Sequence, residues 1–205
     1  MTGGTPVGAF TDADVHTYRC RARELLEYAC GYPEVRAVDT THPRYREVIE
    51  HRQYTPPSSS CGDLAHWMMF ALGVRLGWIN RDAHRGWRVG LNVNLLVPPP
   101  IGACTNARAY LAGERLECGD VIVIANKWPS GTDAHVVCVI DQPEPDVLLT
   151  AEYGQPGGAL CEHVIMAGRL CTRRANGQLT VGRTIRTTLP LARVLASAYT
   201  TGLLA

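Results

Sequence analysis

The chain has 205 residues, and its 20 Lys plus Arg against 19 Asp plus Glu give a formal net charge of +1. A chain of this length can bury a full hydrophobic core in one domain, and its 46% hydrophobic and 19% charged residues exclude a disordered protein. Because it lacks a basic excess or a clustered basic stripe, nucleic acid is not expected as its main partner.

The first half of the chain has the sequence pattern of helices. A helix is predicted over residues 11–31, since Thr11 can cap its start, acidic residues follow in the first turn and apolar residues form one face. A shorter helix is expected over residues 44–51. Residues 61–76 are apolar almost without a break, which predicts a helix buried on most sides. Residues 77–103 combine Gly and aromatic residues with a run of three Pro, and are expected to form irregular surface loops.

From residue 116 onward, short β-branched runs separated by turn residues predict an antiparallel meander. A closing helix is expected over residues 189–199, with Pro190 in its first turn. Helices first and strands second favour a single α+β domain over residues 1–205, with a helical part at 1–115, a sheet part at 116–205 and one shared core. The five expected strands are residues 121–125, 134–141, 147–153, 160–166 and 178–187, the last after a hairpin turn at 175–177.

The cysteine pattern argues against both disulfides and metal. The eight cysteines include no CxxC pair and none beside a His pair at zinc spacing, so most are expected to be buried thiols. No metal and no cofactor are expected. Five histidines without an acidic or Cys neighbour at metal spacing are not expected to be ligands: His16, His42, His51, His84 and His163.

Neither a membrane span nor an export signal is expected. The longest apolar runs have only the length of a strand, well short of the roughly 20 residues that cross a bilayer. Residues 1–13 carry no basic start and no apolar stretch of the kind found in secretory signal peptides. We therefore expect synthesis in a reducing cytosol.

Cys61 differs from the other cysteines in its expected position at the start of a helix. The exposed N–H groups and the helix dipole at such a place stabilise a thiolate. A thiolate that attacks an acyl group needs a base beside it, and a third polar group must orient that base. His135 begins one expected strand and Glu152 lies near the end of the next, so the two can meet in an antiparallel pair. The pattern predicts a Cys61, His135 and Glu152 site.

Four segments in this order resemble the papain-like cell-wall hydrolases, namely the NlpC-type peptidases and the CHAP amidohydrolases. The resemblance spans about residues 54–155 and depends on the order and spacing of the segments. They are SCGDLA at 60–65, CGDVIV at 118–123, AHVVCVI at 134–140 and TAEYGQ at 150–155. The last is similar to the segment that carries the Glu and Asn of the CHAP domains.

The resemblance implies a papain-like α+β fold, with N-terminal helices packed on a C-terminal antiparallel sheet. It implies Cys61 as the nucleophile, His135 as base and then acid, and Glu152 as the residue that orients His135. The sequence departs from the family at Asp63, since a carboxylate two residues after the nucleophile can raise the pKa of the thiol.

Further site residues are expected around these three. The oxyanion hole would use the backbone N–H of Cys61 and a side chain from Gln53 or Tyr54. Gln155 is a candidate fourth member, because the CHAP Asn has no clean match. The substrate cleft is expected to be lined by Trp78, Trp87 and Trp128, which lie in loops that contain Gly and Pro.

The resemblance implies a cysteine peptidase or amidase that cleaves stem-peptide or amide bonds of peptidoglycan. We expect it to act as a monomer and without a membrane partner. Such an enzyme would reach the cell wall through lysis, injection or secretion, as a phage lysin or an antibacterial effector does. Two alternatives stay open. The same site would serve a protease, deamidase or acyltransferase that acts on proteins, and the fold would also suit a non-catalytic structural protein of a virus particle.

Overall fold

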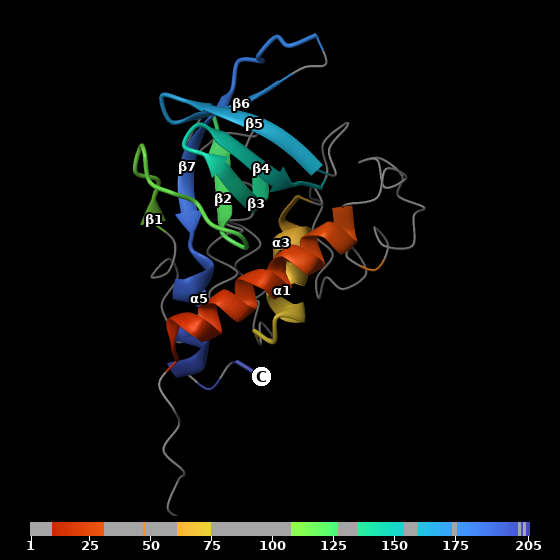
Figure 1. Cartoon of the computed structure of the whole chain (residues 1–205), viewed down its shortest axis with the longest axis vertical. Coiled ribbons are helices and arrows are strands. Elements are labelled where there is room, and N and C mark those ends of the chain that lie inside the picture. Colours follow the sequence, from red (N-terminus) through yellow and green to blue (C-terminus); the bar gives the residue numbers. More distant parts are fainter. Residues whose placement is uncertain are drawn as a thin grey trace, which may run out of the picture.

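The computed structural model describes residues 10–30, 47, 61–74, 108–126, 135–153, 160–173, 176–200, 202 and 204–205. The predicted α+β class is confirmed, because helices and one antiparallel sheet make up this part of the chain (Figure 1). The helices are α1 (Asp12–Cys30), α3 (Cys61–Ala71) and α5 (Leu191–Thr200). The strands are β1 (Arg108–Ala109), β2 (Val121–Ala125), β3 (His135–Glu144), β4 (Val147–Ala151), β5 (Leu160–Met166), β6 (Arg169–Thr172) and β7 (Arg183–Leu189).

The sheet closes on itself. Its order is β1-β7-β2-β3-β4-β5-β6, so β2 to β5 form the predicted meander and β6, which was not predicted, extends it. β7 then pairs with β2 on one side and with β6 on the other, where Arg169 lies opposite Thr184 and Leu170 opposite Arg183. All pairings in the sheet are antiparallel. The result is a barrel-like sheet with an inner and an outer face.

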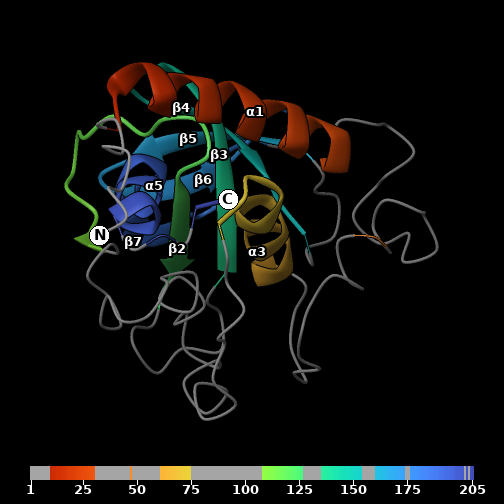
Figure 2. The ribbon, with the colours of Figure 1, turned by 90° about the horizontal axis from the view of Figure 1, so that it is seen from below.

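Closure divides the apolar residues into two clusters: the expected core shared by the helices and the sheet, and a second, unexpected one inside the sheet. Val121 and Val123 of β2 face the helices, whereas Ile122 and Ile124 face the inside of the sheet. Every residue of β2 is buried because both faces of this strand are covered. On the outer face, α1 packs against both α3 and α5, and Figure 2 shows it lying across them. Among the described residues, no helix combines the length and apolar content needed to cross a membrane.

The helix α3 begins at Cys61 as predicted but ends at Ala71, five residues earlier than the expected end at residue 76. Gly73 adopts a left-handed conformation with φ of 88°. Its N–H donates to the Phe70 carbonyl at 2.8 Å, and the N–H of Val74 donates to the Met69 carbonyl at 3.0 Å. This pair of hydrogen bonds is the usual way in which a glycine ends a helix.

The end of the sheet differs most from expectation. β6 was not predicted, and β7 covers 183–189 in place of 178–187. β5 and β6 are joined by Ala167 and Gly168, both with positive φ (48° and 72°), as in the tight turns of hairpins. Alanine rarely takes this conformation, so the sequence carried no turn signal there. The closing helix starts at Leu191, directly after Pro190. The loops expected at 77–103, and the helix at 44–51 apart from Glu47, lie outside the described residues.

The segment before β2 ties two helices to the sheet. Asp120 is buried, and its carboxylate accepts hydrogen bonds from the backbone N–H groups of Leu191 at 3.0 Å and Glu117 at 3.1 Å. Arg19 of α1 pairs with the same carboxylate at 3.1 Å. Gly119, with φ of 83°, brings the backbone close to α1 and α5. The start of β2 is thus held by the side chain of Arg19 in α1 and by the backbone at the start of α5.

Replacing Gly119 by Ala is expected to destabilise the fold strongly. The added Cβ would lie 2.5 Å from Cδ2 of Leu191 and 3.0 Å from Cβ of Ala22, in a conformation that already disfavours side chains. We expect a loss of about 2–4 kcal/mol in the free energy of unfolding, measured by urea denaturation. Gly113→Ala is the matched control, because Gly113 has φ of 84° and open space around it. Its expected cost is about 1 kcal/mol. Equal losses in the two variants would contradict the packing argument.

Candidate active site

Three distant segments bring Cys61, His135 and Glu152 together. Cys61 is the first residue of α3, His135 is the first residue of β3, and Glu152 follows the last residue of β4. α3 packs against β3, and β3 pairs with β4, with Cys138 opposite Ala151. The predicted placement of Cys61 at a helix start and of His135 at a strand start is confirmed, whereas Glu152 lies one residue past β4 and not within the strand expected at 147–153.

The imidazole of His135 interacts with both the thiol and the carboxylate. Its Nε2 is 2.8 Å from Oε2 of Glu152. Cys61 interacts with the same ring. Among the described residues, Nδ1 of His135 has no partner with regular hydrogen-bond geometry. His135 is 1% exposed, Cys61 3% and Glu152 5%. Because the carboxylate of Glu152 accepts hydrogen bonds, Nε2 of His135 carries a proton and donates it in this hydrogen bond.

The electrostatics favour a charged imidazole beside a charged carboxylate. Burial alone would lower the pKa of His135, but hydrogen bonds and charge from Cys61 and Glu152 outweigh it and raise this pKa from 6.5 to about 9. Burial alone would raise the pKa of Glu152, but the hydrogen bonds from His135 and His163 outweigh it and hold this pKa well below its usual range. At neutral pH the site therefore contains an imidazolium next to an ionised carboxylate.

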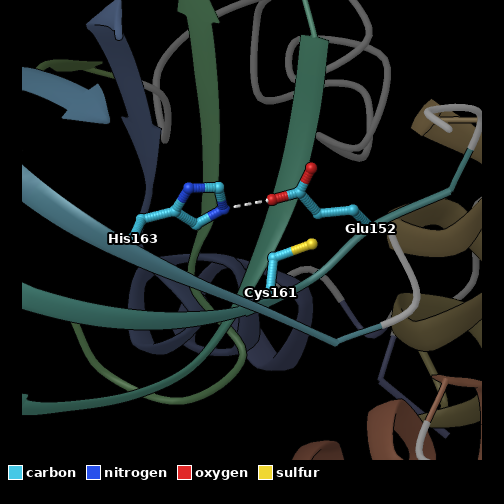
Figure 3. Close-up of side chains that lie close together, drawn as sticks. All are labelled: Glu152, Cys161 and His163. Carbon is cyan, nitrogen blue, oxygen red and sulfur yellow. Dashed lines mark hydrogen bonds and ion pairs between the residues drawn. The ribbon is translucent and has the colours of Figure 1, made fainter. Parts of the chain in front are cut away.

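A second histidine, which the sequence analysis did not assign to the site, binds the same carboxylate. Nε2 of His163 lies 2.6 Å from Oε1 of Glu152 and 3.1 Å from Oγ1 of Thr150, and that hydroxyl also donates to Oε1 at 2.7 Å. The expectation that His163 has no acidic or Cys neighbour at metal spacing is wrong, since Glu152 and Cys161 offer ligand atoms within 4.8 Å of its ring (Figure 3). It is also wrong for His16, whose Nε2 lies 3.7 Å from Sγ of Cys20. Strands β4 and β5 pair in register, with Thr150 opposite Cys161, which brings these side chains to one face.

The same residues form a group with metal-binding atoms. Glu152, Cys161 and His163 each offer one ligand atom, and these atoms lie within 4.8 Å of one another. Two ligands about 2.0 Å from a tetrahedral zinc ion are roughly 3.3 Å apart, so the 2.6 Å between Glu152 and His163 suits a shared proton and not a shared ion. Burial, and then the charge of Glu152, raise the pKa of Cys161 to about 12, whereas a zinc ligand must be a thiolate.

Three further cysteines of the described part have surroundings that disfavour a thiolate. Burial raises the pKa of Cys118 to about 11, and it raises the pKa values of Cys30 and Cys138 further. The seven described cysteines form no disulfides. Of these residues, Cys61 is the one at a helix start with a hydrogen-bonding imidazole beside it. This is the setting in which a thiol becomes a nucleophile.

Several predicted site residues lie outside the described part of the chain. They are the oxyanion-hole candidates Gln53 and Tyr54, the fourth candidate Gln155, and the cleft candidates Trp78, Trp87 and Trp128. The side chain of Asp63 is likewise outside it. The roles expected for them stay predictions.

Comparison with known proteins identifies no relative. No protein-family model, no characterised protein and no solved structure matches the chain. A thiol at a helix start, an imidazole and a buried carboxylate can form an acyl-enzyme and release it to water or to another acceptor.

Proposed function

We propose that the protein is a cysteine peptidase or amidase with Cys61 as nucleophile, His135 as acid and base, and Glu152 as the group that orients His135. The observation that carries the proposal is the buried hydrogen bond of 2.8 Å between His135 and Glu152, with Cys61 interacting with the same imidazole. A buried carboxylate on one ring nitrogen leaves the other nitrogen for proton exchange with the nucleophile.

The reaction follows from these positions. Sγ of Cys61 attacks the amide carbonyl, and the C–N bond breaks as the imidazolium of His135 gives its proton to the leaving amine. Water then attacks the thioester while the neutral imidazole accepts a proton from it. Sγ leaves, and the acid product is released. Glu152 keeps the ring in one orientation and stabilises its charged form in both halves of the reaction.

Peptidoglycan is the substrate class that we propose, within a papain-like fold. Support comes from the segments that resemble the NlpC and CHAP hydrolases, because each occupies a chemically suitable place. SCGDLA includes the start of α3, AHVVCVI the start of β3, and TAEYGQ the end of β4. A protein substrate would use the same three residues and is an outcome of the test below.

Wild-type protein is expected to release stem peptides or free amino groups from purified peptidoglycan, and Cys61→Ser is expected to release none above background. Serine lacks the acidity of the thiol, so the imidazole cannot hold it as an anion. Product masses from a defined muropeptide identify the cleaved bond. The control is Cys20→Ser, which removes an exposed cysteine from α1.

Equal release by wild type and Cys61→Ser would overturn the proposed activity. Selective alkylation of Cys61 with no cell-wall product would favour a protein substrate. Alkylation of Cys61 no faster than that of a buried core cysteine would favour the structural role.

A further inference from the structure

The carboxylate of Glu152 lies between two imidazoles, one on each oxygen. Oε2 is 2.8 Å from Nε2 of His135, and Oε1 is 2.6 Å from Nε2 of His163. We propose that His163 is a positioning residue, which holds Glu152 from the side opposite His135 and so keeps the Cys61–His135 pair ready to react. The inference rests on the proposed function, and it extends the site by a residue that acts through Glu152.

His163 is itself held in place from a third strand. Its Nδ1 lies 3.1 Å from Oγ1 of Thr172, and the two residues face each other in the β5–β6 register. On the other side, Leu148 of β4 lies opposite His163. Neighbouring strands β4, β5 and β6 thus fix the ring, and the view in Figure 3 shows it directed at the carboxylate. A ring held at both nitrogens can hold the carboxylate in one orientation.

The second imidazole matters because Glu152 is buried. A buried carboxylate tends to take up a proton unless several donors stabilise its charge. Oε1 receives an N–H from His163 and the hydroxyl of Thr150. If the N–H donor is removed, the hydroxyl of Thr150 is the donor that remains at Oε1 among the described residues. The carboxylate then binds a proton more readily, and a protonated or rotated Glu152 no longer stabilises the imidazolium of His135.

The other titratable groups around the carboxylate do not compete for this role. These titratable groups lie on β3, β5 and α1. They are His135 and Cys138 on β3, Cys161 and His163 on β5, and Cys30 at the end of α1. Burial raises the pKa values of the three thiols, so they stay protonated and uncharged near neutral pH. The two histidines are therefore the groups whose hydrogen bonds decide the charge of Glu152.

A histidine that merely fills the interior would have the same burial, so the test measures the chemistry of Cys61. The rate of Cys61 alkylation by iodoacetamide is followed against pH by peptide mass spectrometry in wild type, His163→Phe and His163→Gln. Phe keeps a flat ring but has no N–H, whereas Gln restores an N–H donor. We expect the acidic midpoint of the profile to rise by about one pH unit in His163→Phe and to return most of the way in His163→Gln.

In the hydrolysis assay we expect His163→Phe to lower kcat about 10-fold with KM nearly unchanged, because both ring nitrogens of His163 are engaged by Glu152 and Thr172. Thr172→Val, which removes only the partner at Nδ1, is expected to shift the alkylation midpoint in the same direction by less. If His163→Phe does not fold, the alkylation midpoint of Thr172→Val tests the inference in its place. A wild-type midpoint in the folded variants would overturn the inference, whatever their stability. Because alkylation needs no substrate, failure of wild type to cleave peptidoglycan would count against the proposed function alone.

Discussion

Replacement of His135 by Gln should reduce the turnover of amide cleavage by about 10³- to 10⁴-fold. The reason is that both halves of the reaction need a proton carrier beside Cys61, and Gln has the size of the imidazole without its titration. The Gln amide can still hydrogen-bond Glu152, so the buried carboxylate keeps a partner and the fold should persist. The measurement is kcat on a defined muropeptide, with circular dichroism of the variant as the check on folding.

His16→Gln is the matched control for this variant. His16 lies on α1 next to Cys20, at the surface and away from the sheet. Its replacement should leave turnover within about two-fold of wild type, since surface substitutions rarely have larger effects. If His135→Gln kept a tenth or more of the wild-type turnover, His135 would not be the acid and base of the reaction.

Glu152→Gln should lower turnover by about 10²- to 10³-fold and should also lower the pKa of His135. Burial lowers this pKa, and the hydrogen bonds and charges of Cys61 and Glu152 raise it to about 9, so neutralising one of those charges moves it down. The measurement is the titration of His135 by NMR of labelled side chains in the two proteins. At neutral pH the variant should hold less imidazolium than wild type.

Glu162→Gln provides the control, because Glu162 lies on β5 with half of its side chain exposed and pairs only loosely with Arg173, at 3.7 Å. It should alter neither the titration of His135 nor turnover. An unchanged His135 midpoint in Glu152→Gln would show that the carboxylate does not support the charged imidazole. The orienting role of Glu152 would then have no basis.

Two of the three proposed catalytic residues, Cys61 and His135, were predictable because each carries a local signal. A cysteine after a serine run at the start of an apolar helix, and a histidine at the start of a β-branched run, stand out in the sequence itself. Glu152 follows from chain order, since the end of one antiparallel strand lies near the start of the one before it. The strands at 121–125 and 160–166 have the predicted bounds, because the apolar pattern of each is also visible in the sequence itself.

The role of His163 and the closure of the sheet were not predictable, because both depend on register. Which face of β5 meets Glu152 follows from the pairing of Thr150 with Cys161, and a shift by one residue would turn His163 away. The alternation of Cys161 and His163 along one strand was the available signal, but it does not name a partner. Likewise, the pairing of Arg169 with Thr184 joins β6 to β7 without any local motif.

The end of α3 was not predictable from the sequence for a different reason. The apolar run continues past Ala71, so hydrophobicity alone extends the helix to residue 76. Gly73 ends it by adopting a positive φ, which few other residues tolerate. A glycine inside an apolar run is compatible with a helix interior as well as with a helix end, so the pattern did not separate the two.

The most direct test of the account compares the alkylation rates of Cys61 and Cys138 in the native protein at about pH 6. The two thiols are 3% and 0% exposed, so burial alone makes both slow. If Cys61 is a thiolate paired with His135, it should react at least roughly 10²-fold faster than Cys138, and His135→Gln should abolish the difference. Equal rates for Cys61 and Cys138 in the wild-type protein would contradict the assignment of Cys61 as the nucleophile.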